Sequence, residues 1–343
     1  MKYLELVKGL FTDVHEARAK YADPYVAYSI EDNRLMFNLP HESVTYDPYV
    51  TFTAEEDGSS IGLAALSTNQ TMEYSMDTIT WNTFDTTNNI SLPNTGDKVY
   101  IRGILSADNT SSNYTNFKMS GKITANGNCN AIWNHQDLNA QLRNYCGCGL
   151  FYDCSSLTTA PELPATELAD HCYNQMFYNC SSLTTASDLP ATTLGYGCCR
   201  NMFSNCSSLI KAPEILPAQT LTGECYHQMF SHCTSLKVAP KISATTLANY
   251  CCTEMFWDCP NLEVAPVLLS PKVELESYLA MFHSCSNLKH VECHAIDMST
   301  SRCVYKMFYN INTEGTLIKH PDADWANVNA YIPSGWTVVN VEH

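Results

Sequence analysis

The sequence has few basic residues and no long apolar run. Lysine and arginine together number 19 against 35 aspartates and glutamates, which gives a formal net charge of −16. A chain this acidic has no basic stripe to neutralise phosphates, so we expect no nucleic-acid partner and no anionic membrane partner. It also contains no run of about 18 apolar residues and no segment like a signal peptide. We therefore expect no membrane insertion and no export by the general secretory route.

The short motifs of catalysis and cofactor binding are missing too. There is no Gly-x-Ser-x-Gly elbow, no glycine-rich phosphate loop and no His-Glu-x-x-His pair. The densest group of soft ligands, which would suit zinc, is His283, Cys285, His290, Cys293 and His294. Its histidines fall on different faces of the predicted unit, and its first cysteine belongs to a core column. We predict no metal, no cofactor and no enzymatic activity, and keep a metal protein or enzyme as the least favoured alternative.

What the chain has in abundance is one repeated unit. Seven phenylalanines follow one another at intervals of 26, 26, 27, 26, 26 and 26 residues: Phe151, Phe177, Phe203, Phe230, Phe256, Phe282 and Phe308. This spacing predicts a solenoid. Apolar residues and cysteines recur nine, five and one positions before each phenylalanine and three after it. Steps of four trace one face of an α-helix, so we predict that each repeat opens with a helix.

A short strand should follow each helix. The segment Cys-Ser-Ser-Leu-Thr-Thr-Ala-Pro at 154–161 recurs in related form in the later repeats. Its fixed leucine and alanine among variable residues suit a strand that stacks in parallel on its neighbours. Proline cannot donate a ladder hydrogen bond, so the strand should end there.

Most of the 17 cysteines fall into two columns of the repeat. Ser277 replaces the first cysteine in one repeat and Ile311 the second in another, so a disulfide in every repeat would leave stray thiols. We therefore predict buried free thiols that fill the core. Cys199 and Cys252 stand where other repeats carry tyrosine. We expect these two to be more exposed, and the sequence leaves open whether they form disulfides.

The pattern Met-Phe-x-x-Cys-x-x-Leu-x-x-Ala-Pro-x-Leu-Pro-Ala-Thr-x-Leu-x-x-x-Cys-Tyr closely resembles the BspA-like leucine-rich repeats of gut anaerobes' surface proteins and of their bacteriophages. The resemblance covers about residues 142 to 310 and is clearest from Met176 to Tyr196 and from Met202 to Tyr226. The tail around 315–317 and 332–338 is similar to the end of such arrays. It predicts a C-terminal cap that closes the last apolar rung.

The part before the repeats divides in two. Residues 49–127 are rich in Thr, Tyr, Val and Ile and contain short alternating segments between turns, which predicts a small Ig-like β-sandwich. In residues 1–48, the apolar residues at heptad spacing predict a helix: Leu4, Val7, Phe11 and Val14. A hairpin could pair 25–30 with 34–39. This segment could pack on itself, dock to a larger assembly or form an oligomeric stem.

The predicted fold is thus multidomain, β plus an α/β solenoid. It has an N-terminal attachment or oligomerisation segment at 1–48, a β-sandwich at 49–127, a leucine-rich-repeat solenoid at 128–310 with about 26 residues per repeat, and a cap at 311–343.

Recognition should lie where the repeats disagree. The candidates are the aromatics directly after the phenylalanines and two strand lysines: Tyr152, Tyr178, Trp257, His283, Tyr309, Lys237 and Lys289. Exposed aromatics stack on sugar rings or anchor a protein partner. Alternatively, each of them packs on the loop of the next repeat.

The resemblance and the lack of an export signal favour a bacteriophage virion protein, a fibre or decoration subunit. It would be made in the bacterial cytoplasm, attach to other virion proteins through its N-terminal segment, and bind a host surface glycan or protein from the virion surface. The analogy with phage fibres and the two heptads suggest a homotrimer. The alternative is a BspA-like adhesin on a bacterial cell surface.

Overall fold

The structure is a computed structural model that describes residues 3–5, 27–31, 34–38, 47–326 and 328–341. The chain divides into two compact units, Met1–Tyr46 and Asp47–His343. Each unit is described below by itself.

The described part of the first unit is a three-stranded antiparallel sheet. Its strands lie in the order β1 (Tyr3–Glu5), β3 (Arg34–Asn38) and β2 (Ala27–Glu31). Ile30 lies opposite Leu35, which confirms the predicted hairpin. The predicted helix is wrong at Leu4, which lies in β1 and pairs with Phe37. At residues 3–5, pairing with β3 satisfies the backbone N–H and C=O groups that a helix would otherwise have to satisfy. The other predicted helix residues, Val7, Phe11 and Val14, lie outside the described residues.

The second unit begins with two packed sheets. The smaller has the order β10 (Asn116–Ser120), β5 (Ser59–Ala65) and β8 (Asn89–Leu92). The larger runs β12 (Leu157–Thr159), β11 (Ile123–Asn126), β4 (Val50–Ala54), β9 (Lys98–Leu105), β6 (Gln70–Ser75) and β7 (Asn82–Thr83). Burial alternates along β4 and β9, as the alternating sequence predicts. The segment 79–81, one of the short segments expected to alternate as strands within residues 49–127, is instead a turn closed by Asp77 Oδ1, which accepts from the backbone N–H of Ile79 and Thr80.

The larger sheet joins the sandwich to the repeats. β11 pairs antiparallel with β4 and parallel with β12, and β12 belongs to the first repeat. The ring of Phe117 in the sandwich stacks on Phe151 at a centroid distance of 5.3 Å. The sandwich therefore covers the first rung of the solenoid, and the two share one apolar core.

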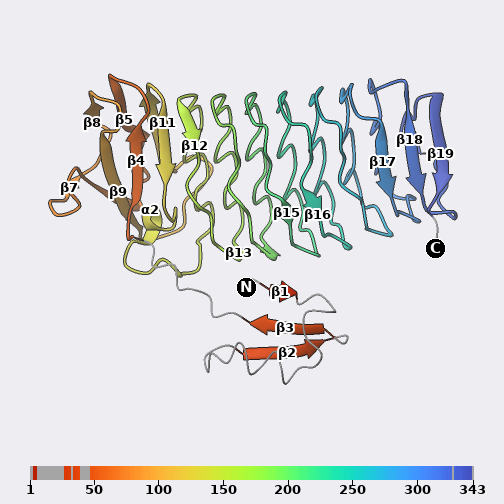
Figure 1. Ribbon diagram of the computed structural model, residues 1–343, viewed down its shortest axis with the longest axis horizontal. Coiled ribbons are helices and arrows are strands. Elements are labelled where there is room, and N and C mark those ends of the chain that lie inside the picture. Colours follow the sequence, from red (N-terminus) through yellow and green to blue (C-terminus); the bar gives the residue numbers. More distant parts are fainter. Residues whose placement is uncertain (1–2, 6–26, 32–33, 39–46, 327, 342–343) are drawn as a thin grey trace. The chain divides into compact units, whose positions relative to one another are not determined.

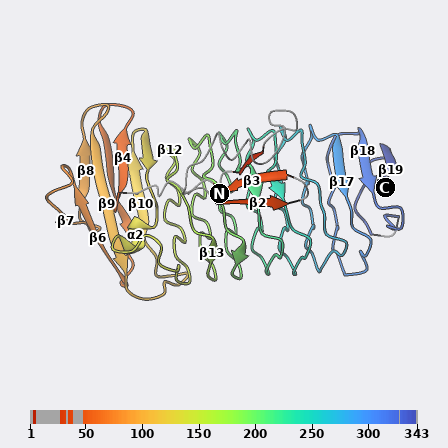
Figure 2. The same ribbon diagram turned by 60° about the horizontal axis from the view of Figure 1, so that its bottom comes forward.

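The repeats themselves form a β-solenoid, not the predicted α/β solenoid. The second unit contains one short helix among its described residues, α2 (Ala131–Asn134), and no repeat opens with a helix. Consecutive tight turns stand there instead. Phe151 N–H donates to Met176 O of the next repeat, whereas Cys154 N–H donates to Phe151 O within its own turn. Figures 1 and 2 show these rungs side by side from β12 to β19.

The prediction of a helix in each repeat was wrong for a physical reason. In every repeat, the residues six and two positions before the phenylalanine and two positions after it have positive φ, so the backbone conformation repeats every four residues. The buried side chains share this period, because they lie five and one positions before the phenylalanine and three after it. Over about 12 residues, the spacing of buried side chains does not distinguish a series of turns with a period of four from a helix with a period of 3.6.

The remaining strands are short and parallel. The pairs are β13 (Glu167–Leu168) with β14 (Thr193–Leu194), and β15 (Ile215–Leu216) with β16 (Lys241–Ile242). Two positions after the leucine that recurs in each repeat, single bridges join Thr159, Thr185 and Lys211. A last parallel sheet consists of β17 (His290–Cys293), β18 (Glu314–Lys319) and β19 (Gly335–Asn340), of which β18 and β19 lie in the region predicted as the cap. There Trp325 and Trp336 pack on Phe308, at centroid distances of 5.9 and 5.5 Å.

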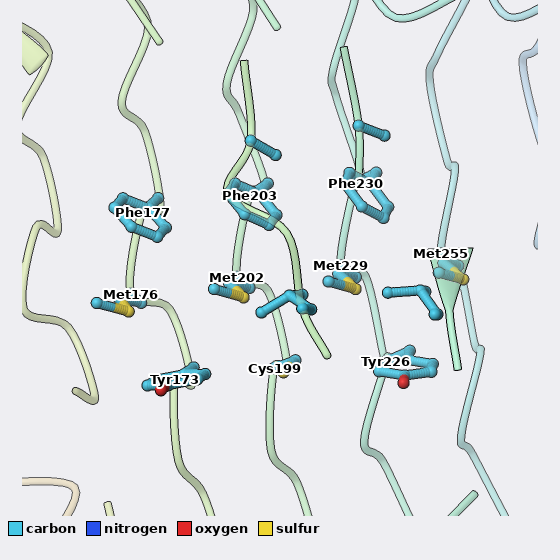
Figure 3. Packing of buried hydrophobic residues seen from close by; sticks show 14 of the residues in the cluster. Tyr173, Met176, Phe177, Cys199, Met202, Phe203, Tyr226, Met229, Phe230 and Met255 are labelled. Carbon is cyan, nitrogen blue, oxygen red and sulfur yellow. The ribbon is translucent and has the colours of Figure 1, made fainter. Parts of the chain in front are cut away.

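The core of the solenoid is built of side-chain columns. The seven phenylalanines stack in register, with centroid distances from 5.3 Å for Phe151 and Phe177 to 6.5 Å for Phe282 and Phe308. A methionine column runs beside them, and a third column alternates tyrosine with cysteine (Figure 3). All 17 cysteines are free and buried.

The expectation that Cys199 and Cys252 are more exposed is wrong, since each is only 1% exposed. Their column reads Tyr173, Cys199, Tyr226, Cys252 and Tyr278, all buried. Large and small side chains alternate there, so each cysteine lies between two tyrosine rungs. This arrangement fills the space in the way that interdigitating core layers do.

Candidate functional site

The candidate site lies along the edge of the stacked turns, in the column directly after the phenylalanines. Each of these residues stands next to a positive-φ residue that carries the chain around the turn. Ser204 and Ser231 in the middle of the column are 4% and 1% exposed. They divide the column into two groups of aromatic side chains.

The first group is the pair Tyr152 and Tyr178. Their rings stack at 4.9 Å with an interplanar angle of 6°, and both are half-buried. Each ring therefore covers one face of the other. Partial burial and the neighbouring Asp153 raise the pKa of Tyr152, so its hydroxyl stays protonated and available as a donor at neutral pH. The pair offers mainly ring edges and hydroxyls to a ligand.

The second group, which we call the aromatic cluster, comprises His232, Trp257, His283, Tyr309 and Tyr331. Neighbouring rings within it lie 5.0 to 5.9 Å apart. Tyr309 and Tyr331 are 43% and 47% exposed. The cluster thus joins four successive repeats to the C-terminal segment in one continuous aromatic surface.

Hydrogen bonds fix the orientation of these rings. Trp257 Nε1–H donates to His283 Nδ1 at 3.0 Å, and Ser284 Oγ also lies 3.0 Å from this nitrogen. His232 Nδ1 lies 2.9 Å from Asp258 Oδ2. Each of these contacts joins residues at or beside the turn edge, so the surface is held in place before any ligand arrives.

The charge at the cluster is small and local. Burial and the nearby Lys306 lower the pKa of His283, so its imidazole is neutral at pH 7 and Nδ1 accepts the hydrogen bond from Trp257. Lys306 Nζ lies 5.4 Å from the ring centroids of both Tyr305 and Tyr309. The arrangement offers aromatic faces, hydroxyls and one ammonium group, which suits binding by stacking and hydrogen bonding.

The two predicted lysines lie in a different column. Lys237 and Lys289 stand seven positions after their phenylalanines, on the strand side of the repeat, and both are exposed. Lys237 Nζ lies 3.8 Å from Glu263 Oε1 in the next repeat, an exposed pair that contributes little to stability. The structure brings Tyr152 together with Tyr178, and Trp257 with His283 and Tyr309, but it shows no contact between these rings and either lysine.

Sequence reasoning missed His232 and Tyr331 as members of the cluster, and Tyr305 and Lys306 as its neighbours. Tyr305 and Lys306 precede Phe308 inside the repeat and could have been found by reading every exposed turn column. Tyr331 carries no such signal, because it lies in the irregular segment between β18 and β19.

The histidine and cysteine group is dispersed rather than gathered. Cys285 Sγ–H donates to Phe256 O at 3.1 Å, and His294 Nε2 lies 2.6 Å from Glu292 Oε1. Burial raises the pKa of Cys293 to about 12. Within the described residues, no three His, Cys, Asp or Glu side chains are placed to hold a metal ion.

In comparisons with known proteins, no family model matches this chain, and no curated protein and no solved structure matches it. None of the described helices has the length and apolar character needed to cross a membrane.

Proposed function

We propose that this protein is a non-enzymatic structural and adhesion protein, a bacteriophage fibre or decoration subunit that contacts the host surface through the aromatic cluster. The observation that carries the proposal is the cluster itself. Five aromatic residues form one surface, and its two outermost tyrosines are more than 40% exposed. Exposed aromatic groups on a rigid frame are typical anchors for sugars and proteins.

Two further features support the proposal. The sequence pattern resembles repeats of bacterial surface proteins and their phages, and the remaining buried columns are occupied by core side chains. Variation at the exposed positions of the column after the phenylalanines therefore changes the surface without changing the frame. The first unit, with its separate three-stranded sheet, would make the attachment to other virion proteins.

The proposal is tested on purified phage particles and on cells. Mass spectrometry of the particles should detect this chain in stoichiometric amount, and labelled protein should bind intact host cells. Trp257→Ala combined with Tyr309→Ala should weaken cell binding by at least about tenfold, or 1.4 kcal/mol. Tyr152→Ala combined with Tyr178→Ala is the matched control, because it removes the other aromatic pair.

Absence of the chain from the particles, together with its detection by surface labelling of intact bacteria, would favour the bacterial adhesin instead. Equal loss of binding in both double variants would contradict the assignment of recognition to the aromatic cluster.

A further inference from the structure

One nitrogen atom in the aromatic cluster lies within hydrogen-bond distance of two different side chains. Trp257 Nε1–H donates to His283 Nδ1 at 3.0 Å, and Ser284 Oγ lies 3.0 Å from the same nitrogen. A neutral imidazole has one nitrogen that donates and one that accepts, whereas an indole N–H can only donate. The hydrogen bond from Trp257 therefore exists only while Nδ1 of His283 carries no proton.

Protonation of His283 reverses the role of this nitrogen. Both nitrogens of an imidazolium donate, so Nδ1–H and the indole N–H of Trp257 would be two donors that face each other. The hydroxyl of Ser284 can accept instead, because its proton rotates to suit the partner. Ser284 Oγ is held in place by Asn310 Nδ2, which donates to it at 3.1 Å. A hydrogen bond from a charged donor is the stronger one, so Ser284 favours the protonated imidazole and Trp257 favours the neutral one.

The surroundings of His283 keep the imidazole where it is. Its backbone N–H donates to Ala280 O at 3.1 Å, and its carbonyl oxygen accepts from Asp258 N–H at 2.8 Å. Its ring stacks on that of Tyr309 at a centroid distance of 5.0 Å. Trp257 meets the imidazole edge-on, at an interplanar angle of 89°. Loss of the bond between the two rings therefore releases the indole rather than the imidazole.

Charged groups face His283 from both neighbouring repeats. Glu254 and Asp258 in the preceding repeat favour the protonated imidazole, whereas partial burial and Lys306 in the following repeat favour the neutral one. The stacked ring of Tyr309 carries a further ionisable group. Burial has the largest effect, so the pKa of His283 lies below its ordinary value of about 6.5. The imidazole is neutral at pH 7 and takes up a proton in acid.

We propose that the aromatic cluster contains a proton-operated switch centred on His283. With Nδ1 unprotonated, Trp257 is bonded to His283 and its indole is fixed. With Nδ1 protonated, His283 donates to Ser284, and the indole loses both its partner and its fixed orientation. The switch itself does not depend on the function proposed above, and only its effect on binding rests on that function.

Fluorine NMR of the full chain labelled with 5-fluorotryptophan tests the switch directly. The chain has five tryptophans, and the resonance that disappears in Trp257→Phe assigns Trp257. Between about pH 7.5 and 4.5, this resonance should shift along a titration curve whose midpoint lies below 6.5. His283→Gln should abolish the shift, because the glutamine carbonyl accepts from the indole and does not titrate. Ser284→Ala should move the midpoint to lower pH, because the protonated imidazole loses its acceptor.

His232→Gln is the matched control. His232 also contacts Trp257, at a ring centroid distance of 5.2 Å, and its Nδ1 lies 2.9 Å from Asp258 Oδ2. The Trp257 resonance of this variant should titrate as it does in the unchanged protein. Three results would overturn the proposal: a Trp257 resonance that does not respond to pH in the unchanged protein, a titration that persists in His283→Gln, or one that vanishes in His232→Gln.

The effect on binding is measured with labelled protein on intact host cells at about pH 7.5 and 5. The unchanged protein should bind at least about threefold more weakly at the lower pH, because a freed indole must be ordered again on binding. His283→Gln should show no such loss. A fluorine titration as predicted, combined with the same pH dependence of cell binding in both proteins, would support the switch and contradict the assignment of recognition to the aromatic cluster.

Discussion

The buried cysteines of the stacked turns are small apolar side chains that also donate hydrogen bonds. In five successive repeats, the thiol three positions after the phenylalanine lies 3.1 Å from the carbonyl oxygen of the preceding repeat's phenylalanine: Cys180, Cys206, Cys233, Cys259 and Cys285. Burial raises the pKa of Cys206 and Cys259 to about 12, so both remain protonated and able to donate at neutral pH. Cysteine in this column therefore fills the core and donates a hydrogen bond, and these thiols form no disulfide.

Ser277 allows the donor role to be tested in the other cysteine column, five positions before the phenylalanine, where it replaces cysteine. Its Oγ donates to Ala248 O at 3.1 Å, as Cys172 Sγ donates to Arg143 O at 3.1 Å in an earlier repeat. Ser277→Ala should lower the free energy of unfolding by about 1–3 kcal/mol, because the part-buried Ala248 O loses its side-chain donor and keeps only the bond of 3.4 Å from Cys251 N–H. Ser277→Cys should stay within about 1 kcal/mol of the unchanged protein. Urea denaturation measures both, and equal destabilisation by the two variants would argue against a donor role.

A second prediction at this scale concerns His227 and pH. Burial and the nearby Arg200 lower the pKa of His227 to about 4, and its Nδ1 is buried without a hydrogen-bond partner in the described residues. In the unfolded chain the group titrates near 6.5. Between these values the unfolded state binds a proton that the folded state does not. Stability is therefore complete above about pH 6.5 and falls as the pH drops toward 4, by up to roughly 3 kcal/mol.

Denaturation at a series of pH values checks this. His227→Gln should flatten the decline between pH 6.5 and 4, because glutamine does not titrate. The same slope in the variant and the unchanged protein would show that other groups cause it.

Among the repeats, one contact interrupts the regular hydrogen bonding. It lies between the third and fourth repeats, and we call it the seam. In the second and third repeats, the amide four positions before the phenylalanine donates backward, as Tyr173 N–H does to Cys146 O and Cys199 N–H to Cys172 O. From the fourth repeat on, the direction is reversed, and Tyr226 N–H donates forward to Cys251 O. Cys198 O and Cys225 O consequently both lie at this seam, and neither accepts a backbone hydrogen bond within the described residues.

This seam should open more easily than its neighbours. Unpaired buried carbonyls cost free energy, so the contact between the third and fourth repeats is weaker than the next contact on either side. Native-state hydrogen exchange should show faster exchange at Asn201 and Phe203, which donate across the seam, than at Gln175 and Phe177, which donate across the preceding contact. Equal protection at the two contacts would contradict this prediction.

The elements also show how far the sequence could be read. The phenylalanine spacing predicts the solenoid, and the alternating segments predict strands such as β4 and β9. The helix prediction failed because the turn run and a helix place buried side chains at nearly the same spacing. Inter-repeat hydrogen bonds distinguish the two, and they join residues about 26 positions apart, as Phe151 and Met176 are joined. A local pattern contains no record of such bonds.

The candidate site was predictable only in part, for a similar reason. Its aromatic column follows from the repeat alignment, but the burial of Ser204 and Ser231 and the approach of Tyr331 depend on tertiary packing.

For the molecule as a whole, we predict that the second unit unfolds cooperatively, because its described residues share one apolar core. Phe117 lies at the centre of the junction, stacked on Phe151 and next to Phe52, and it is 1% exposed. Phe117→Ala should lower the free energy of unfolding by about 3–5 kcal/mol. Amide exchange should accelerate both in β4 and at Phe177, because the core is shared. Loss of protection in the sandwich alone would mean that the two parts fold separately.

We propose that the repeats face outward on a virus particle. Imaging of purified particles with an antibody against residues 142–310 tests it most directly, because location and exposure are read together. We predict regular labelling on the outside of intact particles. Unlabelled particles from which mass spectrometry also fails to detect the chain would contradict the account.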